Sequence, residues 1–380
     1  MTDSAIRVHR SRAFQTHQTM REDILSAIEP LLFGSMHHAY EIRAQFERDF
    51  AAFVAQPHAV AVHSGTIGLF LALRACGVAH GDEVITVSNS DISTTAAIRQ
   101  CGAIPVLCDV LESDYTIDVS LIEPLITPRT RAILPVDLHG HPADVRAVRV
   151  LADRHGLMVI EDAALALGAV DHGVAVSAFA HAAIFSFAPF KPLGSVGNGA
   201  MVVTPHDDIA RRLRLLVGYG YDPDSDGIPD GYQRYIEEGY NVPLDGLEAA
   251  LLSVKLPQLA AWTDARRRVA QAYHDGLRDT AARCPHFRPE SVPTFRSYTI
   301  QVPRRDEIYA HLRRAGVEVV LHYTPAIYHH PVYGGQLPNS YALPVTDRLA
   351  EGLICLPVTP ELTDADTAYV LAELRAQLDL

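Results

Sequence analysis

The chain has 380 residues, of which 32 are basic and 45 are acidic, so its formal net charge at pH 7 is −13. That charge argues against a surface for DNA or RNA, because nucleic-acid binding needs a basic patch. A hydrophobic fraction of 48% and a charged fraction of 20% are typical of a folded globular protein. No apolar run is long enough to cross a bilayer, and residues 1–18 lack the apolar core of a signal peptide. We therefore expect a cytoplasmic protein with neither a membrane nor a nucleic-acid partner.

The cysteines form neither a disulfide framework nor a zinc-binding pattern. They are odd in number and scattered, and no two of them form a CxxC pair. Reduced thiols in the cytosol explain this pattern best. The five are Cys76, Cys101, Cys108, Cys284 and Cys355.

In the first half of the chain, apolar runs typical of buried strands alternate with helical stretches. Residues 41–54 place apolar side chains at helical spacing, which predicts an amphipathic helix packed on a core. A short β-type run then leads into Ser64-Gly65-Thr66 and a helix that stops at Gly77. Further helices are expected around 93–101 and 143–155, and the strand-like runs are 83–88, 104–110, 131–138, 157–162, 182–187 and 199–204.

This alternation is typical of an α/β architecture with a mostly parallel sheet flanked by helices. Ligands of such sheets bind in the crevice beyond the carboxyl ends of the strands. The pattern weakens after about residue 205, where a helix at 207–217 precedes a polar loop and a long helical stretch at 244–277. From residue 293 onward, short strands and helices indicate a smaller α+β domain. We therefore divide the chain into a large domain at 1–250 and a small C-terminal domain at 251–380.

Lysine is almost absent from the chain. Only Lys191 and Lys255 remain among the 32 basic residues. Where arginine has replaced lysine at nearly every other position, a remaining lysine indicates a need for an amine that can lose its proton, which arginine cannot do. Lys191 lies between an apolar run and a glycine-rich turn, which favours a desolvated, nucleophilic amine over a surface lysine with a buried stem. Lys255 lies in an amphipathic helix, and we expect it on the solvated face.

Two further features lie where a parallel sheet would place a ligand. Asp162 closes the run 157–162 at the carboxyl end of a predicted strand, although it could instead cap the next helix. Ser64-Gly65-Thr66 opens a helix, where backbone N–H groups favour a phosphate, although the same residues also serve as ordinary caps. Pyridoxal 5'-phosphate (PLP) needs an anion site, a carboxylate against its pyridine nitrogen and a lysine for the Schiff base. Together with Lys191, these residues predict a PLP site.

With these motifs in this order, the sequence resembles the DegT/StrS sugar aminotransferases, which are fold-type-I PLP-dependent enzymes. The resemblance covers nearly the whole chain. It implies that Lys191 carries the Schiff base, that Asp162 pairs with the pyridine nitrogen, and that Gly65, Thr66 and Ser186 hold the phosphate. It further implies that Asn241 reaches the cofactor of a neighbouring subunit, in a homodimer with shared active sites. The matching stretches are SGTIGLFLALRACGVAHGDEVI, TPRTRAILPVDLHGHPADV, VIEDAALALGA, FSFAPFKPLGSVGNGAMVVT and EEGYNVPLDGLEAALLSVKL.

Some positions depart from the family's pattern. Asp91 stands where the family usually stacks an aromatic ring on the pyridine, Leu165 where it usually has Gln or His, and Pro243 where it often has Arg. Asp91 is still assigned to the cofactor site, where it could hydrogen-bond the ring substituents or recognise a hydroxyl or ammonium of the substrate. A subset of the family has His in place of the Schiff-base lysine and dehydrates sugars. Retention of Lys191 therefore favours transamination.

The remaining candidates are substrate and metal ligands. The resemblance places the segment 321–333 near the substrate entrance, so His322, Tyr323 and His329 are assigned as substrate contacts. His139 and His141 are expected to pack near the sheet end, and we expect no metal site. The polar loop has the carboxylate spacing of a calcium site but ends on Gln233 in place of Glu, so a polar loop without calcium is favoured. The residues at that spacing are Asp222, Asp224, Asp226, Gly227 and Asp230.

The function predicted from these features is PLP-dependent amination of a keto-sugar, with a nucleotide-linked sugar favoured and glutamate or glutamine as the amino donor. Two alternatives stay open. The acceptor could be a cyclitol ketone of an aminoglycoside-type pathway, or the protein could be a PLP-binding regulator or sensor without turnover.

Overall fold

The centre of the computed structural model, which describes residues 6–35, 37–222, 234–334 and 342–379, is a seven-stranded sheet of order β1-β9-β8-β5-β4-β2-β3. All neighbouring strands pair in parallel except β9, which runs antiparallel to both β1 and β8. The predicted mostly parallel sheet is therefore confirmed. The strands are β1 (His58–Val62), β2 (Glu83–Val87), β3 (Ile104–Cys108), β4 (Thr130–Ile133), β5 (Met158–Asp162), β8 (Ala182–Ser186) and β9 (Ala200–Thr204).

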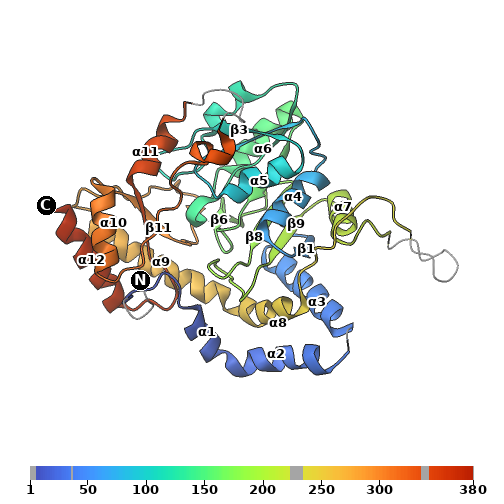
Figure 1. Cartoon of the computed structure of the whole chain (residues 1–380), viewed down its shortest axis with the longest axis horizontal. Helices are drawn as coiled ribbons and strands as arrows, with labels where there is room; N and C mark the ends of the chain where they lie inside the picture. Colours follow the sequence, from blue (N-terminus) through green and yellow to red (C-terminus); the bar gives the residue numbers. More distant parts are fainter. Residues whose placement is uncertain (1–5, 36, 223–233, 335–341, 380) are drawn as a thin grey trace.

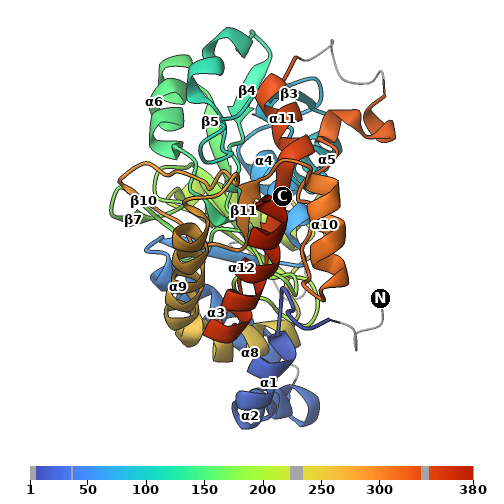
Figure 2. The same cartoon turned by 90° about the vertical axis from the view of Figure 1, so that its left-hand side faces the viewer.

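Helices flank this sheet, and the C-terminal helices gather at one side of it (Figure 1). Two views at right angles place α1 and α2 at the lower end of the molecule, away from the sheet (Figure 2). The helices are α1 (Ala13–Thr19), α2 (Arg21–Phe33), α3 (His37–Phe53), α4 (Gly65–Ala75), α5 (Ile92–Gln100), α6 (Val145–His155), α7 (Asp207–Val217), α8 (Gly246–Lys255), α9 (Leu259–Leu277), α10 (Arg305–Arg314), α11 (Pro344–Gly352) and α12 (Asp364–Leu378).

The elements of the first half lie within a few residues of their predicted ranges. Each of the six predicted strand-like runs contains one strand of the central sheet or most of it. The long helical stretch at 244–277 is divided into α8 and α9 by a 3-10 turn at Leu256–Gln258. Pro257 explains that break, because proline cannot donate the backbone hydrogen bond that a continuous helix needs.

The first core lies around the central sheet and includes four interlocked phenylalanines. Phe46 and Phe50 of α3 pack edge-on against each other, with 5.9 Å between their ring centroids, and both pack against Phe187 at 5.5 Å. Phe50 also packs against Phe185 at 5.5 Å. All four are at most 1% exposed. Edge-to-face packing of this kind fixes α3 against the sheet. Phe53, which shares the predicted apolar stripe, is instead 39% exposed, because it lies at the very end of α3.

A second core belongs to the C-terminal part of the chain. It gathers apolar side chains of α9, α10 and α12 around a two-stranded sheet of β11 (Tyr298–Gln301) and β12 (Leu353–Leu356). Helix α9 reaches both cores, with Leu259 in the first and Val269 in the second. Val8 also joins the second core, through a backbone bridge to Val317. We propose that residue 250 separates two domains, and that the N-terminal residues around Val8 pack on the smaller domain.

A third, three-stranded sheet consists of β6 (Val170–Asp171), β7 (Val174–Ala175) and β10 (Ser291–Val292), and it links the two parts of the chain. Among the helices that the structure describes, none combines the length and the apolar character needed to cross a membrane.

Candidate active site

The predicted cofactor residues meet at one edge of the central sheet. Ser64 and Gly65 follow β1, Asp162 closes β5 and Ser186 closes β8, and these three strands run in the same direction. Lys191 follows Ser186 in a short loop, where its backbone N–H donates to the carbonyl of Ala188 at 2.9 Å. The carboxyl edge of a parallel sheet is where α/β proteins bind ligands, and this edge carries the predicted site.

The N-terminus of α4 and the end of β8 form a cradle for an anion. Ser64 caps α4, and its Oγ accepts a hydrogen bond from the backbone N–H of Ile67 at 3.4 Å. A Cβ placed on Gly65 would lie 3.3 Å from both Cβ and Oγ of Ser186. A side chain at position 65 would press on Ser186, so glycine favours this close approach of the start of α4 to a small hydroxyl. The backbone N–H groups at the start of a helix favour an anion.

Asp162 is a buried carboxylate that accepts two hydrogen bonds. Its Oδ2 accepts from Thr94 Oγ1 at 2.9 Å, and its Oδ1 accepts from the backbone N–H of Ala164 at 3.3 Å. Burial raises the pKa of Asp162, and the Thr94 hydrogen bond and the Lys191 charge oppose that rise. The sequence analysis missed Thr94. Its place in the first turn of α5, after a strand of the same sheet, is the signal that could have found it.

The Lys191 amine is held in a state that is easily deprotonated. Burial and the nearby Arg296 guanidinium lower the pKa of Lys191 from 10.5 to about 8, while the charges of Asp162 and Asp91 oppose that shift. A neutral amine is a nucleophile toward carbonyl groups. The structure thus gives the predicted chemistry of Lys191 a physical basis.

The prediction that Lys255 lies on a solvated helix face is wrong. Lys255 is 3% exposed, and its ammonium donates to the carbonyl of Gly194, in the loop that follows Lys191. Arg266 donates to the carbonyl of Pro192 at 3.2 Å, and Glu248 hydrogen-bonds the backbone of Gly197. The helical pattern could not reveal these contacts, because the loop that covers Glu248, Lys255 and Arg266 comes from a distant part of the chain.

Asp91 combines a capping role with a place beside the site. Its Oδ1 accepts from the backbone N–H of Ser93 at 2.9 Å, so it is the N-cap of α5. The side chain is exposed, and its charge acts on both Lys191 and His322. Leu165, the second departure from the family pattern, packs partly buried against the first core.

Of the three predicted substrate contacts, two lie by the site. The rings of His322 and Tyr323 stack at 4.7 Å, and Lys191, Arg296 and Asp91 all act on His322. Burial, followed by the charge of Arg296, lowers the pKa of His322 to about 4, so this imidazole is neutral near pH 7.

His329 lies apart from that group. Its Nε2 is 3.0 Å from Oδ1 of Asp347 on α11, and its ring packs against Tyr328 at 4.0 Å. None of the interactions found for it within the described residues involves Lys191 or Asp162. The substrate role of His329 therefore stays a prediction without support from its contacts.

His139 and His141 are packed near the sheet end, as expected. Both are buried, with Nδ1 of His139 3.1 Å from Ser297 Oγ and Nδ1 of His141 3.1 Å from the carbonyl of Asp114. Burial lowers the pKa of each imidazole, so both are neutral at pH 7.

Two predictions fall elsewhere. The side chain of Asn241 is exposed on an extended segment next to the cradle, where Val242 accepts the backbone hydrogen bond of His63 at 2.9 Å. Of the acidic loop, only Asp222 belongs to the described residues, where its Oδ1 accepts from Arg211 at 3.2 Å. The rest of the candidate calcium loop, residues 224–233, lies outside them.

Comparison with known proteins identifies the family. The model of the DegT/DnrJ/EryC1/StrS aminotransferase family matches residues 18–375. The chain belongs to this family. As a family member it is a PLP-dependent aminotransferase, which confirms the resemblance drawn from its motifs.

Individual relatives cover almost the entire chain. The erythromycin biosynthesis sensory transduction protein EryC1 of Saccharopolyspora erythraea is 40% identical over 363 residues, 94% of this chain and 96% of the relative. A dTDP-3-amino-3,4,6-trideoxy-α-D-glucose transaminase of Streptomyces venezuelae is 40% identical over 333 residues, 87% and 85% of the two chains. The crystal structure of S. venezuelae DesV in complex with a ketimine intermediate superposes with a TM-score of 0.91, at 36% identity and 99% coverage of both chains.

The residues of this family member fit PLP. The cradle of Gly65 and Ser186 can take a phosphate, because its backbone donors and hydroxyl lie at a helix N-terminus. The buried carboxylate of Asp162 suits a protonated pyridine nitrogen, and the weakly basic Lys191 suits the aldehyde. Gly65, Thr66, Asp162, Ser186 and Lys191 are thus the residues that would hold the cofactor.

Proposed function

We propose that this protein transfers the amino group of glutamate or glutamine to the ketone of a nucleotide-linked sugar. The observation that carries the proposal is the conjunction, at one sheet edge, of a weakly basic Lys191, a buried Asp162 and the Gly65–Ser186 cradle. Its membership of an aminotransferase family supports the reaction type.

Each of these residues has a chemical task. When bound, PLP supplies an aldehyde that condenses with amines and a ring that accepts the electron pair left by a departing proton. Lys191 Nζ, with a pKa of about 8, can exist as a free amine near neutral pH and can take a proton from one carbon and return it to another. Asp162 would hold a negative charge against the ring nitrogen, and Thr94 orients its carboxylate. The cradle would hold the phosphate and so keep the cofactor in place relative to Lys191.

The first acceptor to test is a dTDP-linked hexose with a ketone at carbon 3. The 40%-identical relative from S. venezuelae is named as a transaminase of a dTDP-linked sugar with its amino group at carbon 3. A free cyclitol ketone is the second candidate, favoured by the acidic Asp91 next to Lys191. Neither acceptor needs any change in the roles of Lys191 and Asp162.

A spectral titration tests the proposal. Adding L-glutamate to the PLP-loaded protein should remove the visible absorbance of the bound cofactor, and a dTDP-linked 3-keto-hexose should restore it. A free inosose in place of the nucleotide sugar tests the second candidate. If the absorbance of bound PLP changes with neither glutamate nor glutamine, the protein would be a sensor without turnover. We include this outcome because the relative EryC1 is named as a sensory transduction protein.

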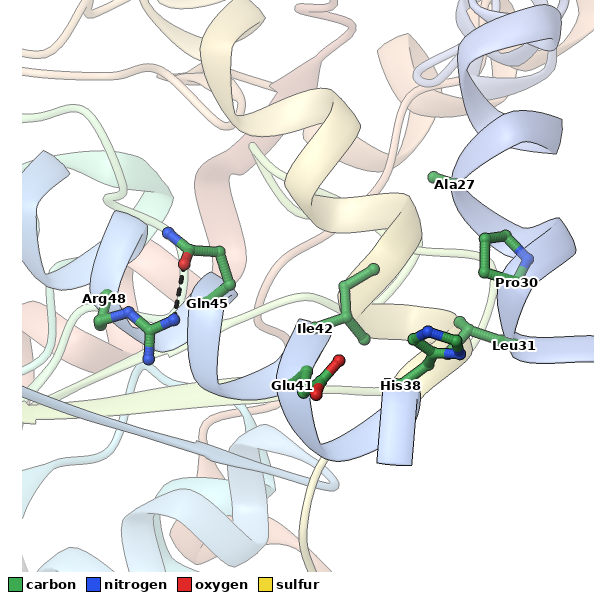
Figure 3. Close-up of a pocket in the computed structure, with 8 residues that line it drawn as sticks. All are labelled: Ala27, Pro30, Leu31, His38, Glu41, Ile42, Gln45 and Arg48. Carbon is green, nitrogen blue, oxygen red and sulfur yellow. Dashed lines mark hydrogen bonds between the residues drawn. The ribbon is translucent and has the colours of Figure 1, made fainter. Parts of the chain in front are cut away.

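We further propose a homodimer with shared active sites. No residue of helix α2 is fully buried in the single chain, and Leu32 and Phe33 at its end are 60% and 83% exposed. Tyr40 in the first turn of α3 is 60% exposed. A pocket separates α2 from α3, and Figure 3 shows Ile42 of α3 facing it. Apolar surface of this extent is typical of a region that another chain covers. A second copy of this chain is the proposed occupant.

Mixing two inactive variants tests the sharing of sites. Lys191→Ala removes the amine, and Asn241→Ala removes the group proposed to reach the partner's cofactor. A mixed dimer would carry both lesions in one site and leave the other intact, so mixing after dissociation should restore up to about one quarter of the wild-type activity. Dimers that stay inactive after mixing would contradict the proposal.

The location proposed for the protein is the cytoplasm. All five cysteines lie within the described residues and are free, and burial raises the pKa of the Cys76, Cys101 and Cys108 thiols to about 12. Unreactive free thiols suit a reducing compartment. Fractionation of the native host cells would test this assignment.

A further inference from the structure

Arg296 is a charged residue next to the site that neither the sequence motifs nor the proposed reaction uses. It lies just before β11, in the C-terminal part of the chain. Its backbone N–H donates to the carbonyl of His139 at 2.8 Å, and that of Thr294 donates to Gly140 at 3.0 Å. The segment before β11 is thus tied to the loop that follows β4, at the same sheet edge as Asp162.

The charge of Arg296 acts on two residues of the site. Its charge is the strongest electrostatic influence on Lys191 after burial, and it acts in the same way on His322. Tyr323, which stacks on His322, in turn acts on Arg296. Arg296 therefore brings a positive charge from the second core to the catalytic lysine.

Among the residues that the structure describes, none is paired with that charge. The Nε of Arg296 is buried without a hydrogen-bond partner, and within the described part of the chain no carboxylate forms an ion pair with its guanidinium. The nearby Glu318 is engaged by Arg10, with 3.3 Å between Nε and Oε1. By contrast, Arg288 is paired with Asp171 at 2.7 Å. Leaving a partly buried cation unpaired costs stability, and an anionic ligand would offset that cost.

We infer that Arg296 binds the α-carboxylate of the amino donor. This inference rests on the proposed function, which brings an amino acid to Lys191. The α-carboxylate is attached to the carbon that carries the reacting amine, so it must lie close to Lys191 Nζ. A planar guanidinium with free N–H groups matches a carboxylate in a bidentate manner.

Two other anions fit this position less well. The phosphate of the cofactor belongs to the Gly65–Ser186 cradle, at the end of β1 and β8. The diphosphate of a nucleotide sugar is separated from the reacting ketone by part of the sugar ring, which places it further from Lys191. Arg296 should therefore serve the donor half of the reaction and not the acceptor half.

The test compares both halves in wild type, Arg296→Gln and Arg296→Lys. With the PLP-loaded protein, Arg296→Gln should raise the apparent Kd for L-glutamate by about 10- to 100-fold, the range for a lost charge-assisted pair. The Kd of Arg296→Lys for L-glutamate should lie between those of wild type and Arg296→Gln, since lysine keeps the charge but loses the bidentate geometry. The Kd for the keto-sugar acceptor should stay within about twofold. Arg278→Gln, which changes an exposed arginine paired with Asp275, is the matched control.

Two further readouts separate this inference from the proposed function. Wild type should prefer L-glutamate to L-isoglutamine, its α-amide, and Arg296→Gln should lose that preference. Binding of α-methyl-L-glutamate to the PLP-loaded protein should show the same loss of affinity without turnover, because this compound keeps the α-carboxylate but has no α-proton to transfer. If wild type never cycles but binds α-methyl-L-glutamate through Arg296, the inference stands and the proposed function fails. If wild type cycles and Arg296→Gln keeps its glutamate affinity, or loses acceptor affinity instead, the inference is overturned.

Discussion

Replacing Thr94 by valine should weaken cofactor binding without disturbing the fold. The Thr94 hydroxyl has a single hydrogen, which it donates to Asp162 Oδ2 at 2.9 Å, so Ser90 Oγ at 2.8 Å must act as its donor. Valine keeps the shape of threonine and removes this relay. Both Thr94 and Asp162 are buried, at 0% and 5% exposed, so water cannot replace the lost donor at either atom.

The size of the effect follows from the charge of the acceptor. A hydrogen bond to an ionised group contributes about 1.5–3 kcal/mol. Since the Asp162 carboxylate must be ionised to hold a protonated ring, this loss corresponds to a PLP affinity about 10- to 150-fold lower. The pKa of Asp162, already raised by burial, should rise further, so the loss should be larger at low pH.

Titration of the apoenzyme with PLP, followed by visible absorbance, measures this effect. Thr95→Val is the control, because Thr95 lies next in α5 but bonds Ile92 and Tyr333 instead of Asp162. Thr94→Ser should restore most of the affinity. An affinity of Thr94→Val within about twofold of wild type, at both low and neutral pH, would refute the role given to this hydroxyl.

Three further perturbations test other parts of the site. Lys255 is 3% exposed and its pKa falls from 10.5 to about 8, so the unfolded apoenzyme binds more protons in that window and stability rises with pH across it. Lys255→Met should remove up to about 3 kcal/mol of that rise in urea unfolding, and an unchanged pH dependence would contradict the burial of this charge. Gly65→Val should push Ser186 away and lower PLP affinity at least about tenfold in the same titration, with a native-like affinity arguing against the cradle. Asp91→Asn removes a charge that raises the pKa of Lys191, so the pH profile of PLP attachment should move to lower pH, and a fixed profile would contradict this electrostatic coupling.

The sequence predicted the part of the site that depends on strand ends. Asp162 and Ser186 each close an apolar run, and such runs in a parallel sheet finish at one edge. Gly65 is the first residue of α4, shortly after β1, and Lys191 lies in the loop after β8, so their places follow from the same topology. Local sequence order was enough for these residues, because each lies within a few positions of a strand that the pattern already located.

The contacts that cross the chain could not be predicted. Lys255 looked solvent-exposed because its helix is amphipathic, yet the loop after Lys191 covers it. Arg296 approaches the site from beyond the domain boundary, and its unpaired charge is visible only once the second core is in place. The contact of His329 with Asp347 was not predictable either, and the substrate role that the family resemblance implies for His329 stays a prediction. In each case the informative contact is long-range, and periodicity carries no information about such contacts.

PLP should attach to Lys191. Borohydride reduction of the PLP-loaded protein followed by peptide mapping tests it directly, because the chain has only two lysines. We expect a label on the peptide that contains Lys191 and none in Lys191→Ala. A label on Lys255, or a protein that stays colourless after incubation with PLP, would contradict it.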